Sequence, residues 1–150
     1  MAGPLNYTTK INAAQTVTEC SMLLAQHGAD AIQTTYTEGR VTGVGFLLHG
    51  HEYALPVDVD AMHRVLEAAV GKGLRSGHQS QAALRSREHA ERVAWRVVND
   101  WLEAQLALVA AQQIPLDEVM LPYLITATGR PLRAEWRDHP LAITAGGSRA

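Results

Sequence analysis

The sequence predicts an α+β fold: a single compact domain in which a small antiparallel sheet of three to four strands packs on helices. Three short runs with strand-like patterns follow one another over 31–57, and helical patterns flank them on both sides. Residues 87–113 form a long central helix in the C-terminal half, apolar around most of its circumference. Because 150 residues suit one domain with a real core, we expect the domain to span 1–138, with a flexible tail over 139–150.

The N-terminal part predicts a strand followed by a helix. Residues 7–11, YTTKI, alternate in polarity, which favours a short first strand. Asn12 followed by Gln15 has the spacing of a capping box, so a helix is expected to begin there. Gly28 marks the end of this helix, because glycine adopts the left-handed conformation of a helix C-terminus at the lowest cost.

Three strands are expected next, at 31–37, 41–49 and 52–57. The middle strand alternates most clearly, with Val44, Phe46 and Leu48 on one face. The opposite face is expected to carry Val41, Gly43, Gly45 and Leu47. Proline cannot donate a hydrogen bond to a sheet, so Pro56 places the third strand at an edge or ends it there.

A second helix and a loop connect the two halves of the chain. Asp58 or Asp60 is expected to cap this helix, and Gly71 to end it. Residues 71–81 contain three glycines and two serines and have no hydrophobic pattern. We therefore expect a mobile loop over 71–86.

The long helix carries two adjacent apolar stripes. The first stripe consists of Ala90, Val93, Ala94, Val97, Trp101, Ala104, Leu108 and Ala111. The second stripe consists of Trp95, Val98, Leu102, Leu106 and Val109. Such a helix is either the central element of the fold or packs on its own domain with one stripe and on a second subunit with the other. We expect a homo-oligomer with Trp95, Leu102 and Leu106 at the interface, because this patch is costly in water.

The C-terminal part predicts one helical turn and a hairpin. Pro115 ends the long helix, because the residue before a proline resists the helical conformation. Residues 115–120 begin with proline and carry early acids, which is typical of a short helix. Residues 121–125 and 132–136 are expected to pair as a small hairpin around 128–130.

Composition excludes several classes of protein. The net charge of −2 leaves no whole-molecule basic field, so nucleic-acid binding would need a local patch. The single cysteine, Cys20, excludes an internal disulfide and fits a reducing compartment. No signal-peptide pattern or membrane-spanning apolar run is present. We expect a cytoplasmic protein without a membrane partner.

No residue set predicts an enzyme. The segment His49-Gly50-His51 is a close histidine pair, but zinc needs three or four ligands, so turn polarity explains it better. Cys20 falls on the apolar side of its helix, so a core residue is expected rather than a nucleophile. We therefore expect no catalytic residue, no metal and no cofactor. An enzyme of unfamiliar geometry is the third possibility, after the two binding functions below.

Positive charge gathers in the middle of the chain. From His63 to Arg96 there are seven Lys or Arg residues and three acidic residues, a local charge of +4 (7 − 3). A flexible loop and a helix start in this segment supply backbone amides that bind phosphate. The candidate phosphate-binding residues are Lys72, Arg75, His78, Arg85, Arg87, Arg92 and Arg96. The alternative is a solvated positive face without a ligand.

Three runs of the sequence resemble a known group of proteins. They are EHAERVAWRVVNDWLEAQLALVAA at 88–111, LDEVMLPYL at 116–124 and YTTKINAAQTVTECSMLLAQHGADAI at 7–32. Together they resemble small proteins of phages and prophages over most of 6–125. The resemblance implies a phage-associated setting, and hence the host cytoplasm, but it assigns no functional residue.

Two functions follow from these observations. The first is a non-catalytic phage-type accessory protein that binds nucleic acid or another phosphate-rich ligand through the basic loop and helix face. The alternative is an oligomeric interaction protein of the anti-defence type, which inhibits a host protein or sequesters a nucleotide signal. The alternative rests on the near-neutral charge and the excess apolar helix surface.

Overall fold

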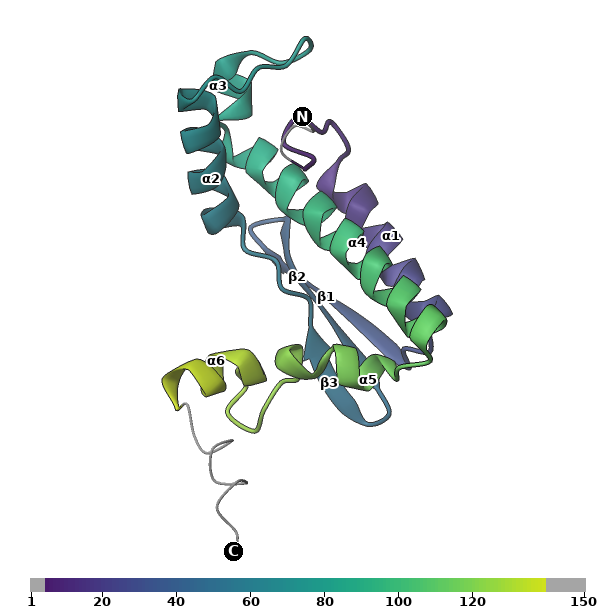
Figure 1. Ribbon diagram of the computed structural model, residues 1–150. Helices are drawn as coiled ribbons and strands as arrows, with labels where there is room; N and C mark the ends of the chain where they lie inside the picture. The colour runs from purple at the N-terminus through teal and green to yellow at the C-terminus, as the bar shows by residue number, and fades with distance from the viewer. Residues whose placement is uncertain (1–4, 140–150) are drawn as a thin grey trace, which may run out of the picture.

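The computed structural model describes residues 5–139 and confirms the α+β class. Its elements are α1 (Ala13–Gln26), β1 (Ala31–Thr37), β2 (Arg40–Leu48), β3 (His51–Ala54), α2 (Val59–Gly71), α3 (Gln81–Leu84), α4 (Arg87–Gln112), α5 (Leu116–Val119), the 3-10 turn η1 (Leu121–Tyr123) and α6 (Leu132–Asp138). The antiparallel sheet has the strand order β1-β2-β3. Helices α1 and α4 lie side by side across one face of the sheet (Figure 1). Helices α2 and α3 lie where α4 begins, while α5 and α6 lie at the opposite end (Figure 1).

The middle strand, β2, contains a bulge. Its inner face carries Val44, Phe46 and Leu48, as the alternation predicts. Thr42 has no partner in β1, because the register shifts between Thr35 and Tyr36. The bulge brings Val41 to the inner side, where it packs against the core. The expected position of Val41 on the outer face is therefore wrong.

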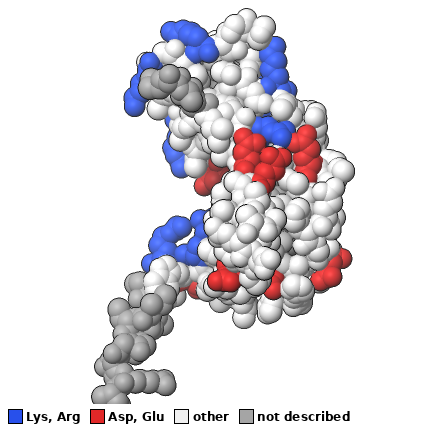
Figure 2. Space-filling view, turned by 45° about the vertical axis from the view of Figure 1, so that its right-hand side comes forward, with Lys and Arg blue, Asp and Glu red and all other residues white. Residues whose placement is uncertain are grey.

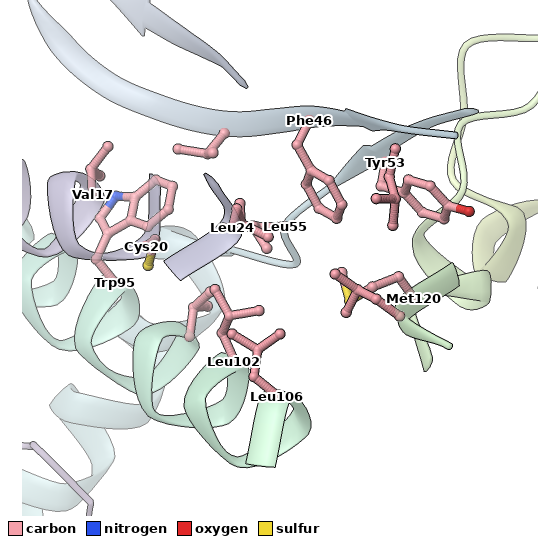
Figure 3. Close-up of a cluster of buried hydrophobic side chains, with 14 residues drawn as sticks. Val17, Cys20, Leu24, Phe46, Tyr53, Leu55, Trp95, Leu102, Leu106 and Met120 are labelled. Atoms are coloured by element: carbon pink, nitrogen blue, oxygen red, sulfur yellow. The ribbon is translucent and has the colours of Figure 1, made fainter. Parts of the chain in front are cut away.

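The main core fills the space between the sheet and the helices α1, α4 and α5. Trp95 of α4 is fully buried and lies beside Val17 and Cys20 of α1 (Figure 3). Further along the sheet, Phe46 stacks on Tyr53 with ring centroids 5.2 Å apart (Figure 3). Large apolar side chains therefore hold the helices α1 and α4 against the sheet.

The second apolar stripe of α4 belongs to this core. Trp95 and Leu102 have no exposed surface, and Leu106 is 3% exposed. The expected oligomer interface at these three residues is wrong, because α1 and the sheet of the same chain cover them. Apolar periodicity indicates that a stripe is buried, but it does not indicate what covers the stripe.

A smaller cluster lies between α2 and the first half of α4. It consists of Leu66, Ala90 and Val93, all without exposed surface. Its alanine and valine come from the first stripe of α4. The long helix therefore contributes to two separate apolar clusters with its two stripes.

The N-terminal segment forms a turn where a strand is expected. Residues 5–8 form this turn, and none of 7–11 pairs with the sheet. The backbone oxygen of Tyr7 lies 2.6 Å from Nε2 of His89, so this segment packs against the helix α4. Within residues 5–139, it has no strand beside it with which to pair. The cap of α1 is confirmed at Asn12, whose side chain accepts a hydrogen bond from Ala14 N at 2.7 Å.

The expected C-terminal hairpin is also wrong. Single bridges join Tyr53 to Leu124 and Ile125 to Pro131, and the second half of the expected hairpin is the helix α6. Proline directly before a helix and an acid in its first turn both favour the helical form. The expected tail lies outside the described residues beyond 139. In the described part of the chain, no helix is long and apolar enough to cross a membrane.

Candidate functional site

Positive charge gathers at one end of the molecule, over α2, α3 and the loop between them (top of Figure 2). We call this region the basic end and define it by Arg64, Lys72, Arg75 and Arg85, which are all exposed. Within residues 5–139, none of these four side chains forms an ion pair. Their charge is therefore available to an anionic ligand.

The local sequence fixes the backbone of the basic end. Gly73 has a φ of +109°, so the chain reverses after α2 in a conformation that favours glycine. Ser80 and Ser86 cap α3 and α4, and each hydroxyl accepts a backbone hydrogen bond at 3.1 Å. Leu84 anchors α3 because it is fully buried. Helix α3 lies inside the segment where a loop over 71–86 is expected.

Three of the seven predicted site residues are engaged elsewhere. Arg87 pairs with Asp60, and Arg92 pairs with Glu88 of its own helix at 3.4 Å. Arg96 pairs with Glu19 of α1 at 2.5 Å, and only 12% of its side chain is exposed. The pairs of Arg87 and Arg96 join α4 to α2 and to α1, whereas the pair of Arg92 lies within α4, so a carboxylate already matches each of the three charges.

The other predicted residues lie at the basic end. Arg75 donates to the backbone oxygen of Leu74 at 2.8 Å, which holds its guanidinium near the loop. His78 is exposed, and its backbone N–H donates to Ser76 Oγ at 3.2 Å. His63, which the sequence did not single out, lies 2.7 Å from the backbone oxygen of Arg85 and connects α2 to the end of α3. Arg64 was also missed, although it lies within the same basic segment.

A buried histidine joins α4 to the N-terminal segment. His89 has no exposed surface, and its Nε2 donates to the backbone oxygen of Tyr7 at 2.6 Å. Its Nδ1 accepts from Arg92 at 3.3 Å, so a neutral ring satisfies both nitrogens. Burial lowers the pKa of His89, and the nearby positive charge of Arg92 acts in the same direction. His89 is therefore a structural group rather than a ligand for phosphate.

The expected core position of Cys20 is confirmed. The residue is fully buried, and its Sγ lies 3.4 Å from Asn99 Oδ1 of α4. Burial raises the pKa of the Cys20 thiol to about 12. At neutral pH the group is a thiol, so it is not a nucleophile in this fold.

The histidine pair lies in a tight turn, as its sequence predicts. His49 and Gly50 have φ values of +50° and +80°. His49 Nδ1 lies 2.7 Å from Asp117 Oδ2, and this hydrogen bond raises the pKa of the exposed histidine. Among the described residues, no group of three or more His, Cys, Asp or Glu side chains is placed to hold a metal ion.

An open apolar groove lies between α1 and the β1–β2 hairpin, away from the basic end. It has a volume of about 600 Å³ and is within the size range of ligand sites. The Arg40–Glu91 ion pair lies at its margin. Its apolar lining comes from Ala13, Ala14, Val17, Met22, Ala25, Ile32, Tyr36 and Val41. The sequence did not predict this groove, because its two walls are separate elements that each look like ordinary amphipathic surface.

Comparisons with protein-family models, with curated proteins and with solved structures find no match to this chain. The resemblance to phage and prophage proteins therefore stays a prediction. The functional argument rests on the geometry of the basic end and of the groove.

Proposed function

We propose that this chain is a non-catalytic binding protein that holds nucleic acid, or another phosphate-rich ligand, at its basic end. The proposal rests on a difference in ion pairing between the cations of α4 and those of the basic end. Arg87, Arg92 and Arg96 of α4 are paired with carboxylates, whereas the four residues of the basic end are exposed and form no ion pair within residues 5–139. Phosphate contacts need such accessible cations.

The geometry supports a smaller site than the sequence predicts. Lys72, Arg75 and Arg85 remain from the predicted set, His78 lies in the same loop, and Arg64 of α2 joins them. A few phosphate contacts give an affinity that falls steeply with salt and depends little on base sequence. We therefore propose positioning on a phosphate backbone rather than readout of bases.

The absence of catalysis is part of the proposal. Two groups with reactive chemistry are committed to structure: Cys20 is a buried thiol with a pKa of about 12, and both ring nitrogens of His89 are hydrogen-bonded. Neither faces the basic end as an available base or nucleophile. A binding role needs only the exposed cations and requires no nucleophile or base.

Fluorescence anisotropy tests the proposal with labelled single-stranded DNA, duplex DNA and RNA over a series of salt concentrations. We expect binding that weakens as salt rises. The double variant Arg75→Ala/Arg85→Ala should bind more weakly, and the slope of log affinity against log salt should fall by about 2.

A charge-matched variant provides the control. Arg133→Ala/Arg137→Ala removes two cations from α6, at the other end of the molecule, and should leave binding nearly unchanged. Equal losses in both double variants would contradict the proposal, because they would indicate a net-charge effect. Absence of binding to all three nucleic acids would leave a small phosphate ligand, which calorimetry with nucleotides tests directly.

The second candidate function is protein interaction. The observation that favours it is the apolar groove beside α1, which lies next to a sheet edge that no other part of the described chain covers. Apolar grooves and open strand edges are recurrent sites for protein partners.

A further inference from the structure

The two edges of the sheet differ in whether another part of the described chain pairs with their backbone. At the β3 edge, Tyr53 forms a bridge with Leu124, and Ile125 N donates to Glu52 O at 2.8 Å. At the β1 edge, no strand or bridge from the described residues pairs with the outer side of the backbone. The N–H and C=O groups on that side are therefore free to pair with another strand.

The open edge lacks the features that usually prevent pairing. Proteins protect edge strands with lysine and other charges, with proline, or by keeping the strand short. Strand β1 has seven residues, AIQTTYT, with no charged residue and no proline. The adjacent bulge lies in β2, so β1 itself is not interrupted.

The groove lies on the same side of the sheet as α1 and continues from this edge. Met22 of α1 is 57% exposed and Tyr36 of β1 is 66% exposed, and both line the groove. The one charged residue of α1, Glu19, is paired with Arg96 of α4 and does not line the groove. A partner that brings its own helix to this side meets an uncharged α1 surface.

We propose that β1 pairs antiparallel with β1 of a second copy of this chain, which joins the two sheets into one of six strands. The register that uses all seven residues places a two-fold axis at Thr34. Residues on one face of a strand then meet residues on the same face of its partner, so Ile32 lies opposite Tyr36 of the second copy. Aromatic and β-branched residues make favourable cross-strand pairs.

A second copy fits this edge better than an unrelated strand. The seven strand residues are self-complementary in the Thr34 register, because none of them is charged. The one like-charge contact, between Asp30 and Glu38 of the second copy, lies at the two ends of the pair, beyond the strand. The second copy also places its own α1 on the same side of the joined sheet, where the two grooves meet. Met22 and Tyr36 of each copy then cover apolar surface that is open in the single chain. This inference replaces the interface expected at Trp95, Leu102 and Leu106 and is independent of the basic end.

Sedimentation velocity over a range of protein concentrations measures the oligomeric state and tests this proposal. The variants place a charged side chain at the two-fold axis. The wild type should be dimeric. Thr34→Lys or Thr34→Glu alone places two like charges directly opposite each other and should give monomers. An equal mixture of the two variants should restore the dimer, because opposite charges then meet at the axis.

The control variant is Thr42→Lys, which adds the same charge at the exposed bulge of β2 instead of at the edge and should stay dimeric. Thermal melting of each variant shows whether it is folded. A wild type that is monomeric at every concentration overturns the proposal and leaves the edge for a different protein. A dimer that survives both Thr34 variants overturns it as well, because its interface then lies elsewhere.

Discussion

The two apolar clusters that share α4 differ in size and in the charges around them. The main core has fourteen buried residues from the sheet, α1, α4 and the segment around α5, while the cluster under α2 has three. Beside the main core, Arg96 pairs with Glu19 and Arg40 with Glu91. Beside the smaller cluster, Arg87 pairs with a carboxylate of α2, and the cations of the basic end, which form no ion pair within residues 5–139, lie nearby.

This difference indicates that stability and ligand binding depend on different regions of this small protein. Large buried side chains and paired charges make the α1–α4–sheet region a rigid support. The basic end rests on few buried side chains, and regions with few apolar contacts open at lower free-energy cost. A binding surface placed there can adjust to a ligand without disturbing the main core.

The comparison is tested most strongly by truncating one large side chain in each cluster. Trp95→Ala should lower the free energy of unfolding by about 3–5 kcal/mol, because it leaves a large cavity in the main core. Leu66→Ala should cost less, about 2–3 kcal/mol, since a small cluster near the surface can collapse around the missing atoms. Urea unfolding measures both values. Equal losses would indicate that the two clusters are energetically equivalent.

The pH dependence of stability tests the buried histidine beside the smaller cluster. The pKa of His89 is below 6.5 in the folded state, so the unfolded state binds the extra proton first as pH falls. The stabilisation from neutral His89 is therefore complete above about pH 6.5 and is lost as pH falls toward the folded-state pKa. The free energy of unfolding should fall with pH by up to about 1.4 kcal/mol per unit.

His89→Gln is the matched variant for this measurement. In this variant the free energy of unfolding should depend less on pH between about pH 7.5 and 5. This range extends about one to two units on either side of the usual histidine pKa. His49 has the opposite effect, because its hydrogen bond with Asp117 raises its pKa and stabilises the fold at lower pH. It is present in both proteins, so its contribution cancels in their difference. Parallel profiles would show that His89 titrates normally.

The smallest expected effect on stability is the difference between removing a cation that forms an ion pair and removing one that forms none within residues 5–139. Arg96→Ala removes a cation whose side chain is 12% exposed and which joins α4 to α1, so it should destabilise the fold by about 1 kcal/mol. Arg85→Ala should change stability by less than about 0.5 kcal/mol, because its guanidinium has no ion-pair partner among the described residues. Thermal melting at low and high salt checks both. A larger loss for Arg85 would mean that the basic end is a structural element.

Local patterns predicted most of the elements correctly. Alternation located the three strands, and Asn12 and Pro115 located the ends of α1 and α4. The segment that became α6 was misassigned, because five residues of mixed polarity fit a strand and a helix equally well. The helix-start signals around Pro131 and Glu135 were the available evidence against a hairpin.

Long-range contacts explain what the sequence could not predict about the sites. Arg96 looks like part of a basic face until Glu19, 77 residues away, is seen to neutralise it. Likewise, nothing near Trp95 in the sequence shows that α1 covers it. Composition located the positive segment correctly, but pairing across the fold decides which of its cations remain accessible.

The packing of α1 against α4 has a consequence for synthesis of the protein on the ribosome. Cys20 meets Asn99, which is 79 residues further along the chain. At about 5–20 residues per second, roughly 4–16 s pass between the synthesis of the two. During this interval the apolar side of α1 has no helix to cover it, so the nascent chain presents a binding surface for chaperones.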